Sequence, residues 1–161
     1  MDSLKELLKG FDPEMLLESL LPEMDTFVDF LQLALRLCVM VAPLVLLGMG
    51  LYLFLKPPAE ANHLIGFRSY RAMASVESWR FSQRLAGMVW GVLGTVLTIV
   101  MAILCNTMAG KNALDMAMFA TSCLIWELAL VALSYLAIWI TVLVFFDHKG
   151  VRRERFAHIL F

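Results

Sequence analysis

The chain alternates long apolar runs with short polar segments, a pattern that predicts several membrane-spanning helices. The run Leu37–Leu55 contains no charged residue, and two later runs, Leu85–Cys105 and Met116–Phe146, are longer. A helix of about 20 apolar residues rises far enough to cross a hydrocarbon core of roughly 30 Å. We therefore predict an all-α integral membrane protein whose three transmembrane helices lie near residues 31–55, 83–105 and 118–146.

Prolines and glycines modify the first two spans. Pro43 should kink the first helix, and the triplet Lys56-Pro57-Pro58 should end it. In the second span, Gly87 and Gly91 are four residues apart, and small residues at this spacing let two helices approach closely in lipid. We predict that this face packs within the molecule. Packing between two copies of the chain is the alternative, so a homo-oligomer stays open.

The composition agrees with a membrane protein and does not favour a nucleic-acid-binding, disulfide-linked or zinc-binding protein. Apolar residues make up 61% of the 161 residues and charged residues 17%, with a mean hydropathy of +0.79. In soluble domains, apolar residues make up about 45–50% and charged residues about 25%. The net charge of −1 provides no basic excess that would favour a nucleic-acid partner. The three cysteines lack the spacing of a disulfide framework or a zinc site, so we expect ordinary buried residues.

The N-terminal segment, residues 1–24, differs from the rest because it is acidic and amphipathic. Residues 1–30 hold eight acids against two lysines. Leucines at helical spacing predict two short amphipathic helices at 3–11 and 13–21, the second ended or kinked by Pro22. We expect them to pack on the protein or a partner, or to form a frayed tail at the membrane surface. Residues 25–161 then form a three-span membrane domain.

That domain contains a polar loop at 56–84 and a basic C-terminal tail at 147–161. The loop is the only long polar segment between the apolar runs, and from Asn62 it reads N-x-x-x-G-x-R-S. Gly66 can take a positive φ angle or let another group approach closely. Further on, Ser75 is a good N-cap, so a helix should begin directly after it. The segment is therefore predicted to be an ordered loop that leads into the second span.

This pattern resembles the SdpI-like family of small bacterial membrane proteins, named for immunity to a sporulation-delay toxin. Members carry N-x-x-x-G-x-R-T, then a polar helix start and W-x-F-A-N before a membrane span. The resemblance extends from about Asn62 to the end of the third span, and Ser69 stands where Thr is usual. The matching residues here are Asn62, Gly66, Arg68, Ser69, Ser75, Trp79, Phe81 and Gln83.

The resemblance implies a multi-pass protein of the bacterial cytoplasmic membrane. Such relatives confer immunity to a membrane-active peptide toxin or pass its presence to a cytoplasmic regulator. The implied partners are therefore the lipid bilayer, a peptide toxin and a cytoplasmic regulator. Two other classes stay open: a small transport or lipid-handling protein, and a structural subunit of a larger membrane complex that docks through its acidic N-terminal helices.

No enzyme motif is present, and we predict no catalytic residues, no metal and no cofactor. The three histidines are far apart and lack metal-binding spacing. The arginines of the loop point to anion binding instead. Arg68, beside Gly66 in the motif, is expected to bind a lipid phosphate, a peptide carboxylate or an acidic partner through its donor fork. For Arg71 we favour nonspecific contact with lipid headgroups, and on spacing alone Trp79 belongs to the aromatic belt at the membrane interface.

Two charged residues within or beside the spans, Arg36 and Glu127, are predicted to form an intramembrane pair. Charged groups in a span are costly and usually face a partner or water. Leu55 back to Arg36 and Phe146 back to Glu127 are both 19 steps, about 28 Å of helix. Equal depth on two parallel helices would make them neighbours. The alternative is that each side chain extends separately to the outer interface.

We predict an outer N-terminus and a cytoplasmic C-terminus. Nine of the 13 lysines and arginines lie in the loop and the tail, which three spans place on one side. Cytoplasmic segments carry the excess of basic residues. Alkaline phosphatase fused after Arg84 should therefore be inactive, and a fusion after Lys111 should be active. An active fusion after Arg84 would contradict this orientation.

Overall fold

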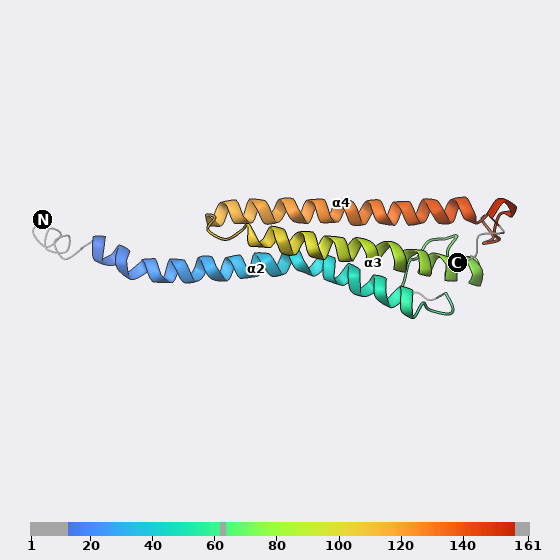
Figure 1. Cartoon of the computed structure of the whole chain (residues 1–161), viewed down its shortest axis with the longest axis horizontal. Helices are drawn as coiled ribbons and strands as arrows, with labels where there is room; N and C mark the ends of the chain where they lie inside the picture. Colours follow the sequence, from blue (N-terminus) through green and yellow to red (C-terminus); the bar gives the residue numbers. More distant parts are fainter. Residues whose placement is uncertain (1–12, 62–63, 157–161) are drawn as a thin grey trace, which may run out of the picture.

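The fold is a bundle of three long helices that lie lengthwise against each other. The computed structural model describes residues 13–61 and 64–156. Helices α2 (Pro13–Leu55), α3 (Val76–Asn106) and α4 (Ala113–Phe145) are followed by the short 3-10 helix η1 (Glu154–Phe156). Figure 1 shows that successive helices run in opposite directions and that α2 extends past the other two at its N-terminal end. The described ranges contain no strand, which confirms the all-α prediction.

Three helical segments are long and apolar enough to cross a membrane: Met24–Leu55 within α2, the whole of α3 and the whole of α4. This confirms the prediction of a three-span membrane protein. At 1.5 Å per residue these segments measure about 46–50 Å, more than a hydrocarbon core of roughly 30 Å. The helices must therefore tilt or extend into the headgroup regions.

Helix α2 starts earlier than the sequence indicated. It runs without interruption from Pro13 through Pro22 to Leu55, so the prediction of a separate short helix at 13–21 is wrong. A proline removes one backbone hydrogen bond and kinks a helix, but the turns on both sides can still continue it. Pro43 also lies inside α2, and Figure 1 shows that the helix bends in its cyan part. The predicted helix at 3–11 lies outside the described residues.

Helices α2 and α3 pack backbone against backbone through glycines, and this is the most extensive helix contact in the bundle. A Cβ atom on Gly87 would lie 2.6 Å from the amide nitrogen of Phe54. A Cβ on Gly50 would overlap the backbone of α3, and one on Gly94 would overlap the backbone of α2. Such an approach is typical of small residues in membrane helices. The prediction that the glycine face of α3 packs within the molecule is therefore confirmed.

The buried side chains form two clusters along the bundle. One lies around Val39, Met101 and Met116 and includes Cys105 and Cys123. The other lies at the opposite end of α3 and α4, and its members are Leu53, Phe67, Ala72, Phe81, Ala86, Ile138, Val142 and Phe146. Two cysteines are thus buried as expected, whereas Cys38 is exposed on α2, contrary to the expectation.

The glycine contact provides a direct test of the packing. Gly94→Ala should lower the free energy of unfolding in detergent by about 1–3 kcal/mol, because its methyl group forces α2 and α3 apart. Gly48→Ala is the matched control, because a Cβ at Gly48 meets no atom within 4 Å. It should leave stability unchanged or raise it slightly, since Ala favours helix over Gly. Equal effects of both substitutions would contradict the close contact at Gly94.

Candidate functional site

The polar loop and the segment after α4 meet at one end of the bundle. We call this assembly the loop end: residues 64–75, the first part of α3 up to residue 84, and residues 146–153. Its contacts join residues more than 70 positions apart, for example Ser75 and Gly150. The loop and the beginning of the C-terminal tail therefore lie on the same side, as the span count predicted.

A glutamine on α3 fixes the loop to the bundle. Gln83 is fully buried, and its side-chain amide forms two hydrogen bonds with the backbone of Phe67. Gln83 Oε1 accepts from the Phe67 amide at 2.8 Å, and Gln83 Nε2 donates to the Phe67 carbonyl at 2.7 Å. Gly66 has φ +113°, and a Cβ there would lie 2.9 Å from Gln83 Cδ. The prediction that Gly66 provides a positive φ angle and close approach is therefore confirmed.

These bonds place the Phe67 ring between α3 and α4. The ring is 1% exposed, and its centroid lies 4.9 Å from that of Tyr135 and 6.3 Å from that of Trp90. The Tyr135 hydroxyl donates to the backbone carbonyl of Arg68 at 3.1 Å. The loop thus enters the bundle as a packed element, as predicted for an ordered loop.

Arg71 completes the end of α4. Its Nη1 donates to the carbonyl oxygens of Leu143 at 3.0 Å and Phe146 at 3.1 Å. The last carbonyls of a helix lack partners within the helix and carry partial negative charge, so a cation stabilises them. Our interpretation of Arg71 as a nonspecific headgroup contact is wrong, because the side chain bonds to the protein itself.

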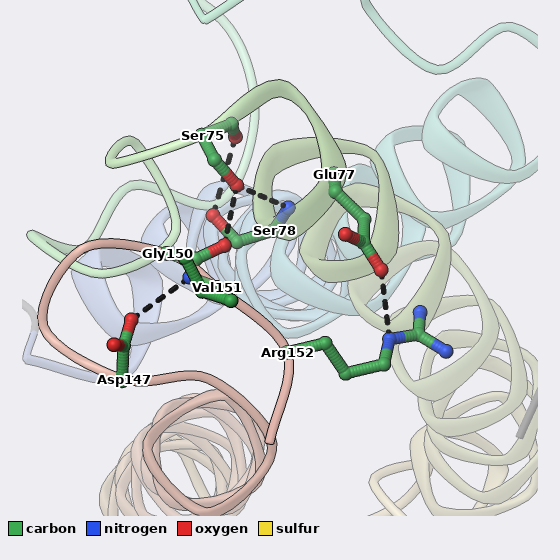
Figure 2. A network of polar contacts seen from close by, with 7 residues as sticks. All are labelled: Ser75, Glu77, Ser78, Asp147, Gly150, Val151 and Arg152. Carbon is green, nitrogen blue, oxygen red and sulfur yellow. Dashed lines mark hydrogen bonds and ion pairs between the residues drawn. The ribbon is translucent and has the colours of Figure 1, made fainter. Parts of the chain in front are cut away.

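Two serines fix the start of α3, one to the turn after α4 and the other to the loop before α3 (Figure 2). Ser75 Oγ accepts from the amide of Ser78 at 3.1 Å, which confirms the predicted N-cap, and donates to the carbonyl of Gly150 at 2.7 Å. Ser78 is fully buried, and its hydroxyl lies 2.7 Å from the carbonyl oxygen of Arg71. The helix cap therefore also anchors the C-terminal segment.

The turn after α4 is ordered by one carboxylate and one ion pair. Asp147 Oδ1 accepts from the amides of Val151 at 2.8 Å and Lys149 at 2.9 Å. The bond from Val151, and to a smaller extent that from Lys149, lowers the pKa of Asp147 because it favours the charged form of the carboxyl group. Arg152 Nε lies 2.8 Å from Glu77 Oε1 on α3 (Figure 2).

Trp79 is buried in the protein rather than placed at the membrane interface. Its side chain is 0% exposed, and Nε1 donates to the carbonyl of Pro58 at 2.9 Å. Assignment to an aromatic belt is therefore wrong, and the side chain instead ties the segment after α2 to the start of α3. Ser69 Oγ accepts from the amide of Ala72 at 3.2 Å and so shapes a turn within the loop.

Of the two remaining motif residues, Arg68 and Asn62, the structure describes only Arg68. Arg68 is exposed, and its carbonyl is held by Tyr135. Its role in binding an anion stays a prediction. Asn62 lies outside the described residues. The motif residues Gly66, Ser69, Ser75, Trp79, Phe81 and Gln83 all belong to the loop end.

Arg36 and Glu127 form no ion pair within 4 Å in the described part of the chain. Arg36 Nε and both Glu127 oxygens are buried without a hydrogen-bond partner. Figure 1 shows that α4 runs further than α2 toward the loop end, so equal step counts from the two helix ends do not reach the same level. Their pairing stays a prediction without a supporting contact.

Sequence reasoning missed the roles of Arg71, Ser78 and Gln83. One signal was available for two of them: Ser78, Trp79, Ser82 and Gln83 fall on one face of α3, and all are buried. Polar residues that share a face with a tryptophan and continue into an apolar span indicate a buried polar contact. No local signal identified the partners, which come from other segments.

Gln83→Met should destabilise the loop end, because it keeps the side-chain length and removes both bonds to Phe67. Each buried backbone group left unpaired costs about 1–3 kcal/mol. We expect a lower unfolding midpoint in detergent and faster proteolysis in residues 56–75. Thr95→Val is the control, because it removes an exposed hydroxyl that bonds only within α3. If the two variants are equally stable, the two Phe67 bonds do not hold the loop.

Comparison with known proteins identifies the family of this chain. A scan against protein-family models matches residues 59–146 to the SdpI/YfhL protein family. No curated protein and no solved structure matches the chain. The matched region contains the loop from residue 59 on, the whole of α3 and the whole of α4, which is more than half of the chain. Six of the residues that suggest this family also build the loop end: Gly66, Ser69, Ser75, Trp79, Phe81 and Gln83. The chain is therefore a multi-pass membrane protein that belongs to the SdpI/YfhL family.

Proposed function

We propose that this chain protects a bacterial cell against a membrane-active peptide toxin. The family match supports an immunity-type role at the level of the family. One observation carries the proposal to this chain: the motif residues Gly66, Trp79 and Gln83 together build one ordered assembly, with Gln83 and Trp79 fully buried. A motif retained only as a membrane anchor would not require these buried contacts.

The proposal assigns different tasks to the membrane region and to the loop end. The apolar outer faces of α2 and α4 are exposed, including Phe27, Val45 and Trp126, and are suited to an apolar peptide in the bilayer. The loop end presents the exposed Arg68, whose guanidinium group suits carboxylate or phosphate. In the predicted orientation this end faces the cytoplasm, where it could hold an acidic regulator that relays the toxin's presence.

The donor fork of Arg68 provides the mutational test. Expression of the wild-type chain in a toxin-sensitive bacterium should raise survival in the presence of at least one peptide toxin. Arg68→Lys should reduce that protection about tenfold or more, because a point charge cannot reproduce two parallel hydrogen bonds worth about 1.5–3 kcal/mol. Survival is measured as colony counts over a toxin dilution series, at matched amounts of protein in the membrane.

Arg80→Lys is the matched control, because Arg80 is also an exposed arginine of the loop end but lies on α3, outside the N-x-x-x-G-x-R-S motif. It should protect as well as the wild type. If Arg68→Lys protects fully while Arg68→Ala fails, only charge matters at this position. Unchanged killing by every peptide toxin tried, with wild-type protein present in the membrane, would refute immunity and leave the transport, lipid-handling or structural roles.

A further inference from the structure

The middle of the bundle contains one carboxyl group that faces inward. Glu127 lies on the buried stripe of α4 and is 1% exposed, whereas its neighbours Trp126 and Leu128 are 68% and 71% exposed. The stripe consists of Met116, Ala120, Cys123, Glu127, Ser134, Ile138 and Val142. Helical periodicity therefore directs the carboxyl toward α2 and α3 rather than toward lipid.

No described protein group forms a hydrogen bond with either oxygen of Glu127. The next polar residue on the stripe, Ser134, is already engaged: it accepts from Trp90 Nε1 at 3.2 Å and donates to the Val131 carbonyl at 2.7 Å. Other buried polar side chains of the bundle, such as Gln83, are likewise paired. Glu127 is thus an exception to the rule that buried polar groups are hydrogen-bonded.

No described group forms an ion pair with Glu127 that would balance a negative charge. Cys123 on the same stripe of α4 and Cys105 on α3 belong to one buried cluster, and a neutral thiol offers no positive charge. Arg36 on α2 has no ion pair with Glu127 within 4 Å. Lys111 lies over the Phe119 ring at 4.4 Å. An ionised carboxylate in an apolar site without a paired charge is very costly, and the group takes up a proton instead.

We propose that Glu127 is a proton-binding site within the membrane bundle, and that it holds its proton in the conformation described. The carboxyl is too enclosed for a larger ligand to reach it without movement of the helices. The described residues also offer no cluster of three groups that could hold a metal ion. The proton is therefore the ligand that fits. Release requires that the carboxyl reach water or a cation such as Arg36. The inference does not depend on the proposed immunity.

The first test uses dicyclohexylcarbodiimide, an apolar reagent that modifies protonated carboxyl groups in apolar surroundings. The purified full chain, reconstituted in phosphatidylcholine vesicles, should acquire an adduct that peptide mapping assigns to Glu127. Glu127→Gln should acquire none there. Glu77, with a side chain 57% exposed and paired with Arg152, is the internal control and should stay unmodified. Labelling should fall about tenfold for each further pH unit once the carboxyl ionises.

Arg36→Met distinguishes proton binding from the predicted ion pair. If Glu127 holds a proton, this variant should label at the wild-type rate. If Arg36 keeps the carboxyl ionised, its removal should accelerate labelling about tenfold or more, and that result would overturn the proposal.

Infrared spectroscopy provides a second measurement that does not require entry of the reagent. The wild type at neutral pH should show the C=O band of a protonated carboxyl, and Glu127→Gln should lack it. A carboxylate band in its place would overturn the proposal whatever the labelling result. Because Gln is neutral and similar in size, the variant should fold and serve as the reference spectrum.

Discussion

The two hydrogen bonds between Gln83 and the Phe67 backbone are the interaction on which the loop end depends. A loop cannot enter an apolar bundle unless its backbone amide and carbonyl find partners, since each unpaired group costs about 1–3 kcal/mol. A single side-chain amide provides both a donor and an acceptor. With the backbone paired, the Phe67 ring can pack against Tyr135 and Trp90. Gly66 fits here because it adopts a positive φ angle and has no Cβ that would overlap the Gln83 side chain.

The bundle is held together differently along its length and at its end. Apolar helix faces gain little from contact with each other in lipid, because lipid tails are equally apolar. Close backbone contact at Gly50, Gly87 and Gly94 joins α2 and α3. At the loop end, directed polar bonds connect three segments, and Arg71 secures the end of α4. These bonds hold the backbone that carries the exposed Arg68, whose carbonyl accepts from Tyr135.

Glu127 shows what happens where such pairing is absent. Gln83 and Ser134 are buried and satisfied, so they can be explained as structural groups. Glu127 is equally buried but has no bonding partner among the described residues. Such a group contributes no hydrogen bond to the bundle and is costly to bury when charged. Ionisable groups within a membrane usually have a function. Proton binding removes the charge without requiring a protein partner.

The sequence alone determined the three spans, the Ser75 cap, the glycine contact face and the special role of Gly66. Each of these follows from local periodicity or from the conformational range of one residue. Tertiary structure decided that Arg71 binds the end of α4, that Trp79 is buried and that Gln83 meets a backbone 16 residues earlier. It also left Arg36 and Glu127 without an ion pair between them within 4 Å. Helical spacing specifies which face a residue occupies, whereas the axial offset between helices specifies what that face meets, and this offset results from packing of the whole bundle.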